Sequence, residues 1–392
     1  MSYDSLIAKN QQWIDEVWAK LDKKLSRLAV KSRDKIPYTT FNGEHDNRAA
    51  EGADITWWTN GFWGGMMWLM YEGTKNPAYK LTAERSEELL SAALNKVESL
   101  HHDVGFLWHI LSGANYRLTG NRYSRNSALM AAILLARRYN ATGNYIRCWN
   151  EDVERFHLHG KTYDQEVQMT IIDCMMNINL LYWASVELND EEFKNIAISY
   201  ADMAIRDHIR EDGSVVHIVL HSPYEKDKVI DCIMGQGYSK DSSWSRGVGW
   251  ALYGFILSYI HTKEQRYLDT AIKVANHFIK ETQKTDWLPR LDFCQPEEPL
   301  YYDSTAGAIS ACGLIELAKY IEGDDREKYL SAAINVLKAM ELNWCDWTDK
   351  EDSILQMGSE AYTWGIHKPI IYGDYFFVEA ISKLKGSQFL PW

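Results

Sequence analysis

The sequence predicts an all-α fold, an (α/α)6 barrel in which six outer helices enclose six inner helices. Helical periodicity dominates the 392 residues, and helices of two kinds alternate along the chain. Both the first and the last pair contain an inner helix that is apolar nearly all round, whereas an open solenoid, the alternative, needs polar caps at its ends. No linker or low-complexity stretch divides the chain, so we expect one domain over residues 1–392.

The outer helices are amphipathic, with one apolar stripe and charges elsewhere. In "DREKYLSAAINVLKAME" the stripe is formed by Tyr329, Ala333, Val336, Leu337 and Met340. Such a helix covers a core on one side and faces water on the other. We expect six of them, at about residues 5–28, 81–100, 122–139, 190–208, 264–281 and 325–341.

The inner helices lack a polar face and contain many small residues, which indicates burial on all sides. Glycine costs about 1 kcal/mol against alanine in a helix, so its recurrence here indicates that helices approach closely. We expect inner helices at residues 59–73, 104–120, 170–185, 245–260, 304–321 and 373–384. Strand signals are weak, and "GSVVHIVL" (213–220) predicts only a small hairpin with nearby residues.

Polar side chains gather just before each inner helix or in its first turn. Because the inner helices of such a barrel run the same way, their N-termini meet at one mouth, where unpaired N–H groups favour an anion. The residues at these positions are Trp57, Trp58 and Asn60; His101, His102 and Asp103; Asp173; Gln236, Trp244 and Arg246; Asp303 and Ser304; and Lys368, Tyr372 and Asp374.

Two carboxylates in this group are candidates for acid–base chemistry. Asp173 stands alone in the apolar stretch "VQMTIIDCMMNINLLYW", and a buried carboxylate needs a partner or a raised pKa. Asp103, in "SLHHDVGFLW", is a second carboxylate at the same mouth, and two such groups push their pKa values apart. Asp303 and Asp374 are typical of helix N-caps, and we expect a structural role for both.

Composition excludes several classes of partner. The net charge of -12 argues against nucleic acid and anionic membranes. No secretory signal or transmembrane run is evident, and six scattered cysteines suit reduced core residues of a cytoplasmic protein.

No H-E-x-x-H or similar ligand set occurs, so we expect no metal and no cofactor. Aromatic residues make up 13% of the chain, which suits either core bulk or sugar stacking.

Five segments in order resemble glycoside hydrolase family 88, the unsaturated glucuronyl hydrolases. They are "HHDVGF", "TIIDCMMN", "WSRGVGWALYG", "DSTAGAISACGLIEL" and "IYGDYFFVEA", and the resemblance runs from about Trp57 to Ala380. It implies an (α/α)6 barrel that acts on oligosaccharides made by polysaccharide lyases, with Asp173 as acid/base and Asp103 as second catalytic residue. We expect substrate contacts from Trp57, His102, Trp149, His217, Gln236, Trp244, Arg246, Trp250, Lys368 and Tyr372.

The resemblance implies unsaturated glycosaminoglycan disaccharides as the partners of this chain. Their terminal uronate has a C4=C5 double bond, which is a vinyl ether that an acid can protonate. Arg246 either donates to the anionic sugar or forms a salt bridge with an aspartate of the mouth. Some members of the family hold sulfate with a motif S-x-x-S-x-K, and here "TWGIHK" keeps only the hydroxyl of Thr363 and the cation of Lys368. We therefore expect only a modest preference between sulfated and unsulfated substrates.

Three other functions remain open at this point. An unsaturated rhamnogalacturonyl hydrolase of the related family 105 has the same fold and chemistry, although "HHDVGF" favours the glucuronyl type. An epimerase on a similar barrel depends on paired histidines, which do not pair across repeats here. A glycan-binding protein without turnover has no use for both Asp103 and Asp173.

Overall fold

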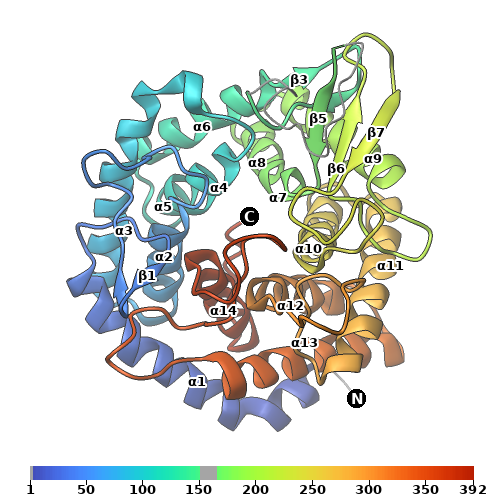
Figure 1. Ribbon diagram of the computed structural model, residues 1–392. Helices are drawn as coiled ribbons and strands as arrows, with labels where there is room; N and C mark the ends of the chain where they lie inside the picture. Colours follow the sequence, from blue (N-terminus) through green and yellow to red (C-terminus); the bar gives the residue numbers. More distant parts are fainter. Residues whose placement is uncertain (1–2, 151–165) are drawn as a thin grey trace.

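The computed structural model describes residues 3–150 and 166–392, and it confirms the (α/α)6 barrel. Figure 1 shows the inner helices enclosed by the outer ones. The outer helices are α1 (Tyr3–Lys31), α3 (Pro77–Leu90), α6 (Arg122–Ala136), α9 (Glu191–Asp207), α11 (Gln265–Thr282) and α13 (Gly323–Trp344). The inner helices are α2 (Phe62–Thr74), α4 (Val104–Trp108) continued by α5 (Ala114–Thr119), α7 (Cys174–Asn177) continued by α8 (Asn179–Leu188), α10 (Ser245–Thr262), α12 (Ser304–Lys319) and α14 (Ile371–Leu384).

The inner ring closes because the last inner helix packs against the first. Helix α14 contacts both α12 and α2, and α10 contacts α12 and α7. Two glycines show how closely these helices approach. A Cβ on Gly254 of α10 would lie 2.5 Å from the Met175 side chain, and one on Gly313 of α12 would lie 3.1 Å from the Tyr253 backbone. The small residues of the inner segments are therefore required by packing.

Several helix boundaries differ from the expected ones, and the difference is largest in the second outer and the second and third inner helices. Helix α3 begins earlier, at the Asn76 cap whose side chain accepts from Ala78 N, and it ends at Leu90. Two 3₁₀ turns follow it, at Ser91–Asn95 and Val97–Ser99. The Ser91 hydroxyl donates to the Glu88 carbonyl, a local side-chain bond that competes with continuation of the regular helix. The second inner helix contains a π turn at His109–Gly113, whose carbonyls at both ends accept from Arg117.

The third inner helix begins later than expected, because residues before Asp173 form a strand. Strand β5 (Gln168–Ile171) pairs antiparallel with β6 (Ile218–His221), and β6 pairs with β7 (Val229–Ile233). The hairpin expected near 213–220 is thus β6 and β7, with a third strand added. Two short strand pairs complete the elements: β1 (Thr40–Phe41) with β2 (Glu44–His45), and β3 (Tyr139–Asn140) with β4 (Tyr145–Ile146).

Side chains close the end of the ring at which the inner helices end. Trp392 is buried and stacks on Phe376 of α14, with ring centroids 5.8 Å apart. Its indole N–H donates to Glu379 at 3.0 Å, and Figure 1 shows the C-terminus inside the ring. The N-terminal ends of the inner helices, at the other end of the ring, carry the polar residues that the sequence singled out.

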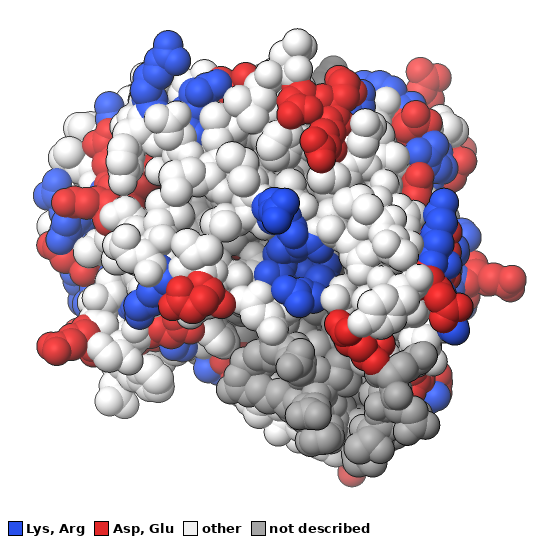
Figure 2. Space-filling model, turned by 90° about the horizontal axis from the view of Figure 1, so that it is seen from above, with Lys and Arg blue, Asp and Glu red and all other residues white. Residues whose placement is uncertain are grey.

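The surface seen in Figure 2 carries basic and acidic side chains interspersed with neutral residues. None of the described helices has the length and apolarity that crossing a membrane requires. All six cysteines are free thiols, as expected, but the expectation that they lie in the core is wrong for Cys294, which is exposed, and for the half-buried Cys232 and Cys345.

Candidate active site

Asp103 and Asp173 lie at the N-termini of neighbouring inner segments, α4 and α7. Each occupies the N-cap position without using its carboxylate as a cap. Both are nearly buried, with exposed fractions of 7% and 9%. Asn177, one turn after Asp173, donates from its amide to Asp103 Oδ1 at 3.2 Å, and its Oδ1 accepts from Phe106 N at 2.8 Å. This asparagine fixes the two segments to each other.

Burial raises the pKa of both carboxyl groups. It raises the pKa of Asp173 to about 7, against the opposing effects of the Arg246 charge and the Trp250 indole. The pKa of Asp103 rises well above its usual range, through burial first and then through the negative charge of Asp173, while the Asn177 amide opposes the rise. At neutral pH the site therefore retains a carboxylic acid, as general acid catalysis requires.

His217 faces Asp173 from the start of the three-stranded sheet. Its Nε2 lies 3.7 Å from Asp173 Oδ1, and its backbone carbonyl accepts from Ile172 N, next to Asp173. Its Nδ1 accepts from Gln236 N at 2.9 Å, so in the neutral ring the proton sits on Nε2, toward the carboxylate. Gly235 has φ +60°, and a Cβ there would lie 2.1 Å from His217 Nδ1, so only glycine fits this turn.

Three residues of α10 and its N-cap lie beside this pair. Trp244 is buried, and its ring packs on His217 with centroids 4.1 Å apart. The Arg246 guanidinium lies over the Trp244 ring at 4.5 Å. Trp250 is fully buried against Phe106, with centroids 5.2 Å apart. The expected residues of this helix therefore form one aromatic and cationic wall next to Asp173.

Arg246 forms a buried ion pair with Asp303, the salt bridge that the sequence left open. Its Nη1 donates to Asp303 Oδ2 at 2.6 Å and to the Ser359 carbonyl, and its Nη2 donates to the Glu360 carbonyl at 2.6 Å. The arginine is only 1% exposed. Its terminal nitrogens therefore donate to protein acceptors, and it acts on Asp173 through its charge.

The remaining aspartates of the mouth are structural. Asp303 caps α12 by accepting from Thr305 N at 3.1 Å, as expected. Asp374 does not cap α14 but accepts from the backbone of Ile354 and Leu355, so it holds the loop before that helix. The expectation of a structural role is met in both cases, by different contacts.

Loops from several parts of the chain complete the mouth with an ion pair and aromatic rings. Lys368 Nζ lies 2.9 Å from Glu360 Oε1 and 5.0 Å from the centre of the Tyr38 ring, and Tyr38 also donates to Glu360. Gln236 donates from its amide to the Glu360 carbonyl at 3.0 Å, which fixes its loop to the same segment. Tyr372 is buried, with the Trp58 ring 4.9 Å away between centroids.

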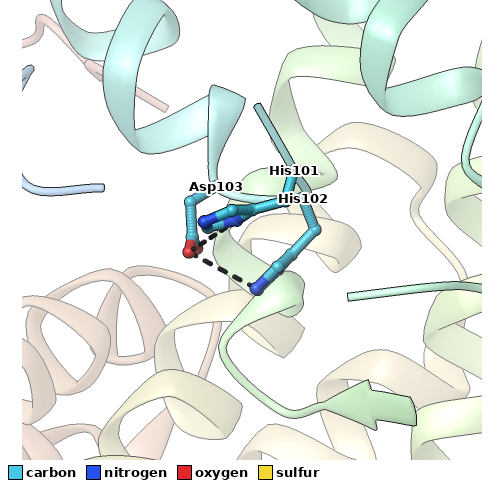
Figure 3. Close-up of side chains that lie close together, drawn as sticks. All are labelled: His101, His102 and Asp103. Atoms are coloured by element: carbon cyan, nitrogen blue, oxygen red, sulfur yellow. Dashed lines mark ion pairs between the residues drawn. The ribbon is translucent and has the colours of Figure 1, made fainter. Parts of the chain in front are cut away.

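Trp57 and Trp149 are half-buried and present aromatic surface. Trp57 meets Tyr38 edge-on, with ring centroids 5.8 Å apart. Trp149 meets His102 edge-on, with centroids 6.1 Å apart. His102 is itself buried next to His101 and Asp103, as Figure 3 shows.

Sequence reasoning missed Asn177, Glu360 and Tyr38. Asn177 had a signal, because it is a polar residue four positions after Asp173 in an otherwise apolar helix. Glu360 and Tyr38 lie in loops far apart in the sequence, and no local pattern indicates that they meet Lys368.

Replacing Asp303 with asparagine should destabilise the protein strongly, because the buried Arg246 charge then lacks its counter-charge. Breaking a buried pair costs about 3–5 kcal/mol. The matched control is Asp202→Asn, whose partner Arg266 is exposed like Asp202 itself, and an exposed pair contributes about 0–1 kcal/mol. Thermal and urea unfolding of both variants measures the difference. Equal losses in the two variants would contradict the structural importance of the Arg246–Asp303 pair.

The comparisons with known proteins agree with this geometry. No protein-family model matches the chain. The chain is 33% identical over 339 residues to an unsaturated glucuronyl hydrolase of Bacillus sp. (strain GL1), covering 85% of this chain and 87% of the relative. It is 32% identical over 349 residues to an unsaturated chondroitin disaccharide hydrolase of Streptococcus pneumoniae (strain ATCC BAA-255 / R6), covering 86% of this chain and 84% of the relative.

A solved structure extends the likeness to three dimensions. The crystal structure of the unsaturated glucuronyl hydrolase from Bacillus sp. GL1 superposes with a TM-score of 0.82 at 30% identity, covering 92% of this chain and 94% of that one. Sequence identity above 30% over most of both chains, with the same barrel, is sufficient to assign the family. The chain belongs to the unsaturated glucuronyl hydrolases, the glycoside hydrolase family 88 that its motifs resemble.

Proposed function

We propose that this glycoside hydrolase releases the C4=C5 unsaturated glucuronyl residue from the non-reducing end of glycosaminoglycan oligosaccharides produced by lyases. The observation that carries the proposal is the buried pair Asp103 and Asp173, in which burial raises the pKa of both carboxyl groups and that of Asp173 to about 7. The names of the relatives favour this substrate over an unsaturated rhamnogalacturonide. We also propose a cytoplasmic location, which the six free thiols support.

In the proposed mechanism Asp173 is the general acid. Its Oδ1 has no hydrogen-bond partner among the described residues, whereas the Oδ1 of Asp103 is held by Asn177. Asp173 transfers its proton to C4 of the vinyl ether, and positive charge develops at C5 and the ring oxygen. The ionised Asp173 then accepts a proton from water as the water oxygen bonds to C5. The resulting hemiketal opens to a C5 ketone, and the hemiacetal left at C1 expels the rest of the sugar chain.

The surrounding residues position the substrate and adjust this acid. His217 can donate from Nε2 to Asp173 or to the sugar, and burial holds the pKa of this histidine well below its usual range, so the ring stays neutral. The Arg246 charge limits the rise in the pKa of Asp173, because it favours the ionised carboxylate that forms during the reaction. Trp57 and Trp149 are half-buried aromatic side chains of the mouth, and we expect them to contact the sugar.

The variant Asp173→Asn should lose turnover by a factor of about 10²–10⁴ or more, because an amide keeps the shape but neither gives nor takes the proton. The matched control is Asp374→Asn. It also removes a buried carboxylate at an inner-helix N-terminus, one whose pKa burial raises to about 6, but that carboxylate accepts hydrogen bonds from the Ser353 hydroxyl and the backbone of the same loop. The loss of C=C absorbance of an unsaturated disaccharide measures both rates per folded molecule. Near-normal activity of Asp173→Asn would refute the assignment.

The pH profile should show a loss of kcat/KM as the pH rises through about 7. The acid form of Asp173 is the reactive one, and this form predominates below the pKa of about 7 and disappears above it. Activity should then decrease about tenfold per pH unit on the alkaline side. Initial rates from pH 5 to 9, with circular dichroism to verify folding at each pH, test this. A profile that rises with pH across 7 would mean that an ionised base is required instead.

Recognition of sulfate should be weak, because the only cation of the shortened motif is already paired. Glu360 lies 2.9 Å from the Lys368 ammonium and cancels much of its charge. A hydrogen bond to a charged group contributes about 1.5–3 kcal/mol, and Ile366 supplies none.

We expect kcat/KM values for unsaturated chondroitin disaccharides with and without 6-sulfate to differ by less than about 100-fold, equivalent to roughly 2.7 kcal/mol. Glu360→Gln should shift the ratio toward the sulfated substrate, because it removes the charge that competes with sulfate for Lys368. The control Glu225→Gln breaks an exposed lysine pair elsewhere and should leave the ratio unchanged. An unchanged ratio in Glu360→Gln would show that this ion pair does not determine sulfate preference.

A further inference from the structure

Three potential metal ligands meet at the mouth, immediately before α4. His101 Nδ1 and His102 Nε2 lie 3.3 Å and 3.4 Å from the same oxygen, Asp103 Oδ2. The three ligand atoms all lie within 4.8 Å of one another, and Figure 3 shows both rings beside the carboxylate. Three consecutive residues therefore bring two imidazole nitrogens and one carboxylate oxygen to a common point.

These close approaches are not hydrogen bonds. His102 is 1% exposed, yet neither of its ring nitrogens has a hydrogen-bond partner among the described residues, and His101 Nδ1 has none either. A buried nitrogen without a partner is costly, and these three differ from other such groups because two of them lie beside one carboxylate oxygen. The carboxylate that both nitrogens approach is where a ligand would bind.

The donor set is one that zinc prefers. Imidazole nitrogens together with a carboxylate suit Zn²⁺, whereas Mg²⁺ requires oxygen ligands. Tetrahedral zinc with ligand distances of about 2.0–2.1 Å places its ligand atoms about 3.3–3.4 Å apart. The two distances to Asp103 Oδ2 match this spacing, and the two nitrogens lie within 4.8 Å of each other. The His101 side chain is 23% exposed and the Asp103 side chain 9%, so the cluster lies close to the surface of the mouth.

We propose that His101, His102 and Asp103 form an inhibitory Zn²⁺ site at the mouth of the barrel. The three protein ligands leave the fourth position of the metal to water. Zinc bound there occupies the Asp103 carboxylate and places positive charge beside Asp173, which favours the ionised form and removes the acid. The inhibitory part of the proposal rests on the proposed function, whereas the binding part does not. The proposed hydration mechanism uses no metal, so EDTA should not lower the activity.

Calorimetric titration with Zn²⁺ tests binding without reference to activity. The protein carries Cys294→Ser, because a thiolate is a zinc ligand and this cysteine is exposed. We expect one zinc ion per chain, and no binding of Mg²⁺ under the same conditions. His101→Asn and Asp103→Asn should each weaken the affinity by more than about tenfold, since even second-shell changes cost 10–100-fold.

The matched control is His109→Asn. His109 is as buried as His102 and likewise lacks partners for its ring nitrogens, but it is not part of the cluster. This variant should bind zinc like the parent. Thermal unfolding gives a second measurement, because zinc should raise Tm for the parent and not for His101→Asn. The absence of saturable binding, or an affinity that is the same in His101→Asn and Asp103→Asn as in the parent, would overturn the site.

Activity measurements separate the proposed zinc site from the proposed function and from inhibition by zinc. Zinc should inhibit turnover of an unsaturated disaccharide by the parent, and excess EDTA should restore it. Zinc binding at these residues without any turnover of that substrate would disprove the proposed function and leave the site intact. Normal turnover without zinc binding would disprove the site and leave the function intact. Binding without inhibition would refute the inhibitory role.

Discussion

The mouth of the barrel depends on one buried cation, the guanidinium of Arg246. It joins α10 to the first residue before α12 through Asp303, and to the carbonyls of Ser359 and Glu360 in the loop that leads to α14. A charge that is 1% exposed is tolerable only when its hydrogen-bonding groups are paired. The loop must therefore lie against α10, and that placement brings the Glu360 carbonyl to the amide of Gln236.

Burial at the mouth also produces the acid of the proposed mechanism, because it raises the pKa of the Asp173 carboxyl group. Burial raises the pKa of Asp173 from its usual value to about 7, and the folded protein consequently binds a proton there that the unfolded chain releases near pH 4. Stability from this group is full at low pH and decreases as the pH rises toward 7, because an ionised carboxylate is then buried. The chain keeps a group that lowers its stability at neutral pH, which is typical of residues retained for chemistry.

The sheet and the helices position the site by different means. Helix N-termini carry Asp103 and Asp173, and their direction is fixed by barrel packing. His217 instead reaches Asp173 because β5 and β6 pair, so that Ile172 N bonds the His217 carbonyl. The predicted helix over 170–185 is wrong at its start for this reason: a strand partner nearly fifty residues away, which no local pattern contains, replaces the first helical turn.

The sequence by itself determined the alternation of outer and inner helices, the common end at which polar residues collect, and Asp173 as an isolated polar residue in an apolar segment. These features are local, because helical periodicity and capping depend on neighbours a few positions apart. Only the tertiary structure decided that Arg246 pairs with Asp303 and that Glu360 pairs with Lys368. It also decided that Asn177 binds Asp103. Most of these partners come from different helices or loops, and which of them meet is set by how closely the helices pack.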